Sequence, residues 1–115
     1  MTNKIIIATG KRKKAVAKAI LKKGNGSVFV NSVFLPNMSP MMYKQRIEEP
    51  ILISGDLAKS IDINVNIKGG GQSGQTEAAR LAIAKGLVEY TGSEELKKAY
   101  LNYDRHLLVA DVRRN

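Results

Sequence analysis

Residues 61–90 read IDINVNIKGGGQSGQTEAARLAIAKGLVEY, and this stretch decides which fold the chain can adopt. Apolar and polar residues alternate from Ile61 to Ile67, which is the period of a strand with one buried face. From Thr76 to Tyr90 the apolar residues recur at helical spacing, so the pattern predicts an amphipathic helix that ends at Gly92. A strand followed closely by a helix therefore forms the centre of the predicted fold.

A glycine-rich loop joins this strand to this helix, and it is the first candidate binding site. Glycine adopts left-handed backbone angles at little cost and lets the chain approach another molecule closely. Free amides at the start of a helix favour an anion, most often a phosphate. We expect Ser73 or Thr76 to cap the helix. The candidate phosphate-binding residues are Gly69, Gly70, Gly71, Gln72, Ser73, Gly74 and Gln75.

Two nucleotide-binding motifs match this loop in part, so a nucleotide-binding enzyme is the alternative function. Gly69-x-Gly71-x-x-Gly74 fits the dinucleotide fingerprint, with the acidic Glu94 about twenty residues further on. The residues around Glu94 look helical, however, and the 41 residues after Gly74 are too few for a doubly wound sheet. The phosphate-loop motif fits except at Gln75, where that motif has a lysine. A phosphate on a polymer fits the loop better than a free nucleotide does, and a tight turn without a ligand is the structural alternative.

The basic residues of the chain are concentrated in its first half. The 115 residues carry a formal net charge of +9. Residues 1–47 hold ten Lys or Arg and no acid, whereas residues 48–115 hold nine basic and ten acidic residues. Such an asymmetry indicates a polyanion as partner. The length and a hydrophobic content of 43% predict a single domain, residues 1–115.

The composition argues against catalysis and against metal or cofactor binding. The chain has no Cys and a single histidine, His106, so no paired-histidine or cysteine metal site is expected. The pairs Glu48-Glu49 and Glu94-Glu95 are adjacent on predicted helices, where their side chains diverge. No apolar run reaches membrane-spanning length, and no signal peptide is apparent, so we expect a soluble, cytosolic protein.

The basic segment KRKKAVAKAILKK, residues 11–23, admits two interpretations. Taken alone it resembles a basic amphipathic helix that could lie on a membrane surface. The Asn25-Gly26 dipeptide that follows is instead a strong hairpin signal, which predicts that strand 15–22 pairs with strand 28–30. We therefore expect a hairpin. The cations that would face a phosphate backbone are Lys11, Arg12, Lys13 and Lys14 in a loop, and Lys18 and Lys22 on one sheet face.

The remaining segments supply the other expected elements. A strand is predicted at 4–9, helices at 40–48 and 94–101, and a last strand at 107–109. Ser39 and Ser93 are the expected caps of the two helices, and Pro50 is expected to stop the first. Met41, Met42 and Ile47 are expected to pack in the core.

Four segments, in order, resemble the family of small-subunit ribosomal protein nine over nearly the whole chain. They are TGKRKKAVAKA, GNGSVFVN, VNIKGGGQSGQTEAARLAIAKGLVEY and LNYDRHLLVADVRR, and the last resembles the archaeal and eukaryotic branch. The resemblance implies an α+β fold of the ribosomal-protein-five second-domain type. That fold has a mixed four- or five-stranded sheet, helices on one side and a left-handed βαβ crossover, which the general handedness rule would not predict.

The resemblance also implies a function. Members of this family are structural, cytoplasmic constituents of the small-subunit head, bound to small-subunit rRNA and neighbouring head proteins. Positions that match the RNA-facing segments of the family are Lys11 to Lys14, Gly69 to Gln75, Arg80, Arg105, Arg113 and Arg114. Family members continue beyond this point into a long basic extension toward peptidyl-site tRNA, whereas this sequence stops at Asn115. A tRNA contact is therefore implied only where such a tail is present.

Overall fold

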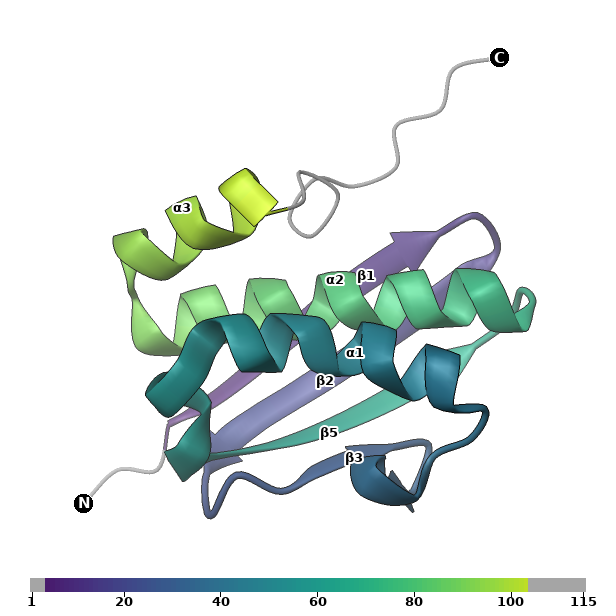
Figure 1. Cartoon of the computed structure of the whole chain (residues 1–115), viewed down its shortest axis with the longest axis horizontal. Coiled ribbons are helices and arrows are strands. Elements are labelled where there is room, and N and C mark those ends of the chain that lie inside the picture. Colours follow the sequence, from purple (N-terminus) through teal and green to yellow (C-terminus); the bar gives the residue numbers. More distant parts are fainter. Residues whose placement is uncertain (1–3, 104–115) are drawn as a thin grey trace.

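The computed structural model describes residues 4–103, which form a five-stranded mixed sheet with helices on one face (Figure 1). The fold class is α+β, as the family resemblance implied. The strands are β1 (Ile5–Arg12), β2 (Ala15–Lys23), β3 (Val28–Val30), β4 (Val33–Phe34) and β5 (Ile61–Lys68), the α-helices are α1 (Met41–Ser54), α2 (Gln72–Thr91) and α3 (Glu94–Tyr103), and short 3-10 turns occupy Leu35–Asn37 and Gly55–Ser60.

The strand order is β1-β2-β5-β3-β4, so β5 lies between β2 and β3. The predicted hairpin between β2 and β3 is therefore wrong: β2 pairs antiparallel with β1 and with β5. The reason lies in Asp62 of β5, whose Oδ1 accepts hydrogen bonds from the backbone N–H groups of Asn25 (2.9 Å) and Ser27 (3.0 Å). The Asn25-Gly26 turn thus passes over the beginning of β5 and does not fold β3 back onto β2.

β3 and β5 are parallel neighbours, and α1 connects them. In Figure 1 both strands run from left to right, and the chain passes in front of the sheet through α1 while it moves upward from β3 to β5. This path is a left-handed crossover, as the family resemblance implied, although almost all connections of this kind are right-handed.

Small residues allow α2 to lie close to the sheet. Ala17, Ala19 and Leu21 of β2 are fully buried on the face that α2 covers, opposite the face predicted for Lys18 and Lys22. A Cβ atom at Gly10 of β1 would lie 2.4 Å from the carbonyl oxygen of Ala78 in α2, so no side chain fits at this contact. The core therefore depends on small side chains at the crossing of α2 with β1 and β2.

Helix α1 differs from its prediction at both ends. It begins at Met41 after Pro40, without a side-chain cap from Ser39, and it continues through Pro50 to Ser54. Proline lacks an N–H, so the carbonyl oxygen four residues earlier, that of Arg46, loses its helical partner. Arg80 Nε of α2 donates to this oxygen at 3.0 Å, which compensates for the missing bond.

Two side chains of α1 that were expected in the core lie at the surface. Ile47 is buried as predicted, but Met41 and Met42 are 64% and 62% exposed. Both methionines belong to the first turn of α1 and lie outside the hydrophobic core. Helix α3 agrees with its prediction, because Ser93 Oγ accepts from the N–H of Leu96 (3.1 Å) and caps the helix.

Candidate nucleic-acid interface

The four basic residues 11–14 form the end of β1 and a tight turn into β2, and not the loop that the sequence predicted. Lys11 and Arg12 are the last residues of β1, and only Lys13 and Lys14 make the turn. Lys13 has a φ of 56°, a left-handed angle that the turn requires. The four cations are therefore fixed at one end of a paired hairpin, and three of them, Lys11, Lys13 and Lys14, are exposed.

The sheet register extends this cluster across the face that no helix covers. Val16 pairs with Lys11 on one side and Lys68 on the other, so these residues form one row. Lys18 pairs with Thr9 and Asn66 in the next row. Opposed residues of antiparallel strands point to the same face, so the three lysines project together. We call Lys11, Lys13, Lys14, Lys18 and Lys68 the basic surface; all five are exposed.

Lys68 is a candidate that the sequence analysis missed. Lys68 lies two residues after Asn66 and four after Asn64 in β5, so all three side chains point to the same exposed face of the sheet. This alternation could have identified Lys68 as a neighbour of the β2 lysines. Within residues 4–103, no carboxylate forms an ion pair with any lysine of the basic surface. Their positive charge is therefore not neutralised inside the described part of the fold.

Lys22 faces the same side of the sheet but lies at its other end. It pairs in register with Asp62 and lies four residues along β2 from Lys18. Hydrogen bonds from the backbone N–H groups of Ser27 and Asn25 lower the pKa of Asp62 below its usual value, and the charge of Lys22 lowers it further. Lys22 thus has an acidic neighbour, unlike the basic surface.

The glycine-rich loop is shorter than predicted. Helix α2 begins at Gln72 with Gly71 as N-cap, so Gln72 to Gln75 form its first turn and only Gly69 to Gly71 form the loop. Neither predicted serine or threonine caps the helix. Thr76 Oγ1 instead donates to the carbonyl oxygen of Gln72 at 2.9 Å. The loop therefore depends on glycine geometry and not on a side-chain cap.

The three glycines of the loop have different environments. Gly69 and Gly70 have φ values of 78° and 68°, and a Cβ atom on Gly70 would lie 2.9 Å from the backbone nitrogen of Ala15. A Cβ atom on Gly69 would lie 2.5 Å from the carbonyl oxygen of Lys14. Nothing lies within 4 Å of the corresponding position at Gly71. Gly69 and Gly70 thus pack the loop against the basic turn, and Gly71 is the glycine open to a partner.

The basic turn and the glycine loop therefore form one continuous region at the same end of the sheet (Figure 1). A Cβ atom on Gly74 would lie 3.4 Å from the carbonyl oxygen of Arg12, so the first turn of α2 also borders the hairpin. The structure brings together two segments that the sequence predicted separately, some 55 residues apart along the chain.

Arg80 lies inside the fold, between α1 and α2. It is 2% exposed, and its guanidinium donates to Glu49 Oε1 (2.7 Å), Glu77 Oε1 (3.0 Å) and the carbonyl oxygen of Arg46 (3.0 Å). Arg46 also pairs with Glu77. This geometry gives no support to an RNA contact by Arg80, because its donors point to acceptors of α1 and α2.

The structure bears on both rival functions. Residues 11–23 are strands and a turn, so the amphipathic membrane helix is wrong. The dinucleotide fingerprint would need Glu94 at the end of a strand, but Glu94 lies in the first turn of α3.

Among residues 4–103 no group of three or more His, Asp or Glu is placed to hold a metal ion. Of the helices that the structure describes, none is long and apolar enough to cross a membrane.

Several predicted features lie outside residues 4–103. These are the RNA-facing residues Arg105, Arg113 and Arg114, together with His106 and the strand at 107–109. They stay predictions from the sequence.

Comparison with known proteins identifies the family. The family profile described as ribosomal protein S9/S16 matches residues 10–115. The chain is 47% identical to the small ribosomal subunit protein uS9 of Desulfurococcus amylolyticus, over 96% of this chain and 79% of that protein. It is 44% identical to the uS9 protein of Pyrobaculum aerophilum, over 98% and 80% of the two chains, and 42% identical to that of Methanococcus vannielii, over 96% and 83%. With a profile match over most of its length and archaeal relatives at this identity, the chain belongs to the ribosomal protein S9/S16 family.

Proposed function

We propose that this protein is a structural, non-enzymatic constituent of the small subunit of the cytoplasmic ribosome. Its single domain binds small-subunit rRNA in the subunit head through the basic surface and the glycine loop, beside neighbouring head proteins. The observation that carries the proposal is the continuity of five exposed lysines with the loop 69–71 at one end of the sheet. The family membership and the names of the relatives support the class of function.

The arrangement of the lysines suits a phosphate backbone. Lys11 and Lys68 are separated by one intervening strand, which corresponds to roughly 10 Å at ordinary strand spacing. This is close to the Debye length of about 8 Å at physiological salt, so the potentials of neighbouring lysines add. Each cation that meets a phosphate releases counterions, which makes affinity high at low salt and strongly dependent on salt.

The glycine loop contributes backbone N–H groups to the same region. Gly71 has no side chain to cap α2, and the first N–H groups of any helix lack intrahelical partners. Such groups suit a phosphate oxygen, and the open space at Gly71 leaves room for one. The loop and the basic turn would thus hold neighbouring phosphates of one RNA strand.

Other parts of the proposal concern residues beyond the described range. Arg105, Arg113 and Arg114 are proposed to add phosphate contacts, because paired guanidiniums form bidentate bonds with phosphates. Contact with peptidyl-site tRNA is proposed only for a chain with a basic tail. The nucleotide-binding enzyme gains no support, since Gln75 donates to the carbonyl oxygen of Gly69 (3.1 Å) where a phosphate loop would present a lysine.

The test is the salt dependence of binding to small-subunit rRNA. The double variant Lys13→Ala/Lys14→Ala removes two charges from the basic surface. The matched control Lys97→Ala/Lys98→Ala removes two exposed charges from α3. We expect the first variant to reduce the slope of log affinity against log salt by about 0.7–0.9 for each lost contact. The control should keep the wild-type slope, and equal slopes for both variants would refute the proposed interface.

A further inference from the structure

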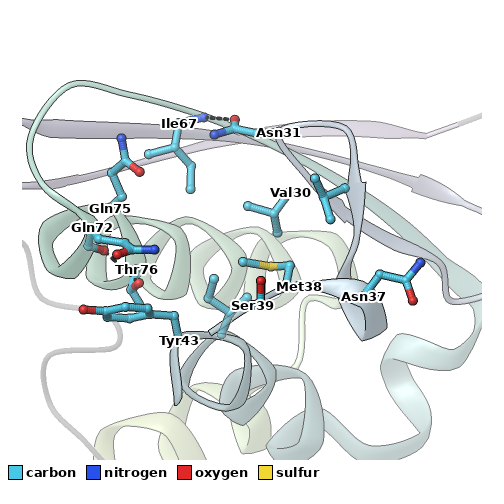
Figure 2. Close-up of a pocket in the computed structure, with 12 residues that line it drawn as sticks. Val30, Asn31, Asn37, Met38, Ser39, Tyr43, Ile67, Gln72, Gln75 and Thr76 are labelled. Carbon is cyan, nitrogen blue, oxygen red and sulfur yellow. Dashed lines mark hydrogen bonds between the residues drawn. The ribbon is translucent and has the colours of Figure 1, made fainter. Parts of the chain in front are cut away.

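A pocket of about 430 Å³ opens beside the first turn of α2, between the end of β3 and the start of α1. Figure 2 shows the side chains that line it, with Asn31 and Gln75 on either side of Ile67 and Tyr43 at the opposite wall. None of the lining residues carries a charge, in contrast to the basic surface nearby. The proposed function gives this pocket no role.

The polar groups of the pocket are amides and hydroxyls, and two of the amides are available. The Oδ1 of Asn31 accepts from the N–H of Ile67 (2.7 Å), and Gln75 donates to Gly69. The side chains of Asn37 and Gln72 are exposed and make no hydrogen bond to another residue of the described range. Each amide offers both donors and an acceptor to a ligand.

These groups match a flat, uncharged ligand with donors and acceptors along its edge and apolar faces. A nucleobase has this chemistry, and aromatic side chains such as Tyr43 stack on unpaired bases of RNA. The volume lies within the ordinary range of small-molecule pockets and exceeds what one base requires. A free nucleotide would bring its phosphates to the same place, where no cation lines the pocket.

The position of the pocket connects it with the basic surface. Gln72 and Gln75 belong to the first turn of α2, directly after the glycine loop. That loop packs on Lys14 and Ala15 of the basic turn. The pocket opens on the helix side of the sheet, so an RNA strand held by the β1–β2 turn and the glycine loop, and not by the sheet-face lysines alone, would lie next to its mouth. We propose that the pocket receives one unpaired base of the bound RNA; this inference rests on the proposed function.

The experiment separates base recognition from phosphate binding. The full chain is titrated with a single-stranded 12-nucleotide RNA of mixed sequence, an abasic strand with the same number of phosphates, and small-subunit rRNA. The pocket variants are Tyr43→Leu, Tyr43→Phe and Gln72→Ala. The matched control is Gln45→Ala, an exposed amide of α1 outside the pocket. Thermal melting identifies any variant that loses stability, and Gln72→Ala alters only an exposed side chain.

We expect Tyr43→Leu to weaken binding of the 12-nucleotide RNA about fivefold or more, the effect of losing one aromatic–base stack. Gln72→Ala should weaken it less, whereas Tyr43→Phe and Gln45→Ala should bind as the wild type does. No variant should change binding of the abasic strand or the salt slope.

Two outcomes would overturn the inference. Wild-type affinity of Tyr43→Leu and Gln72→Ala for the 12-nucleotide RNA would show that the pocket takes no base, which is also the result expected if a protein segment fills it. Equal losses for the base-bearing and abasic strands would show a phosphate effect instead. The proposed function itself fails in a different way, since the wild type would then bind none of the three RNAs.

Discussion

Arg80 and the lysines of the β1–β2 turn, all of which match RNA-facing positions of the family, occupy opposite environments in the structure. Arg80 is buried between α1 and α2, where two carboxylates and a carbonyl oxygen surround its guanidinium. Lys13 and Lys14 project from the β1–β2 turn without a carboxylate partner among residues 4–103. Formal net charge counts both kinds equally. The charge available to a partner is the part that the fold itself does not neutralise.

The choice of residue follows the environment. Arginine presents several N–H donors in a planar fork, so one side chain can satisfy three acceptors in fixed directions. Lysine places a compact charge on a flexible stem, which suits phosphates whose positions vary. The contrast predicts that changes at Arg80 affect stability first, whereas changes at the turn affect RNA affinity first.

The largest effect is expected from Arg80→Ala. Its removal takes the buried guanidinium partner from both Glu49 and Glu77, and it deprives the carbonyl oxygen of Arg46 of its donor. Breaking a buried ion pair from one side costs about 3–5 kcal/mol, and the partial exposure of both glutamates reduces this to about 2–4 kcal/mol. Urea denaturation measures the loss.

Arg46→Ala is the matched control for this variant. Arg46 pairs with the same Glu77, but its side chain is 46% exposed, so the expected loss is about 1 kcal/mol or less. Folded Arg80→Ala should retain the wild-type salt slope with rRNA. If Arg80→Ala lowered the salt slope and left the stability unchanged, Arg80 would be an RNA-binding residue and not a structural one.

A second effect separates Gly70 from Gly71 at the edge of the basic turn. In Gly70→Ala the backbone must keep its left-handed φ, and the new Cβ atom would lie 2.9 Å from the backbone nitrogen of Ala15. We expect the free energy of unfolding to fall by about 1–3 kcal/mol.

Gly71→Val is the contrasting variant, because Gly71 has a φ of −95° and open space at its Cβ position. Its stability should change little, while the branched side chain should weaken rRNA binding. Denaturation and rRNA titration of both variants check this, and strong rRNA binding by Gly71→Val would remove the loop from the interface.

Local patterns in the sequence predicted most of the elements, but not β4, and contacts between distant residues decided how they assemble. Alternation located β5 and the buried face of β2, and helical spacing with Gly92 located α2. The Asn25-Gly26 dipeptide marked a true change of chain direction, but the two strands it joins do not pair with each other. Asp62 of β5 binds this segment from 35 residues or more away along the chain. The handedness of the crossover came from the family resemblance and could not be derived from periodicity.

The candidate site was predictable to a similar extent. The basic segment and the glycines were apparent from composition, and strand parity would have added Lys68. The burial of Arg80 was not apparent, since its partners Glu49 and the Arg46 carbonyl lie on another helix. Packing of the loop on Lys14 is likewise a contact that no local pattern reports.

A smaller effect links Arg80 to Pro50. Pro50 provides no N–H for the carbonyl oxygen of Arg46, and Arg80 supplies the donor instead. In Pro50→Ala the helix can make its own bond to this oxygen, so the Arg80→Ala substitution should cost less there. We expect a coupling of about 1 kcal/mol in a double-mutant cycle, the net value of one hydrogen bond. Strict additivity of the two substitutions would show that the proline and the arginine act independently.

The smallest effect concerns Asp62, an anion that the fold stabilises mainly through backbone N–H groups. Hydrogen bonds from Ser27 and Asn25 are the main cause of the lowered pKa of Asp62, with the charge of Lys22 a minor one. A carboxyl whose pKa is lower in the folded state than in the unfolded chain stabilises the protein at pH values above its ordinary pKa of 3.8. This contribution disappears as the pH falls through the lowered pKa.

Asp62→Asn keeps an oxygen acceptor for the same two N–H groups and removes the charge. We therefore expect the wild type to be the more stable protein at neutral pH, by less than in the cases above, and the difference to shrink as the pH falls below about 4. Because the main partners are backbone N–H groups, the difference should persist at high salt, which screens only the contribution of Lys22. Urea denaturation of both proteins from neutral to acidic pH, at low and high salt, measures these dependences. A difference that does not vary with pH would show that the acceptor geometry of Asp62, and not its charge, holds the turn over β5.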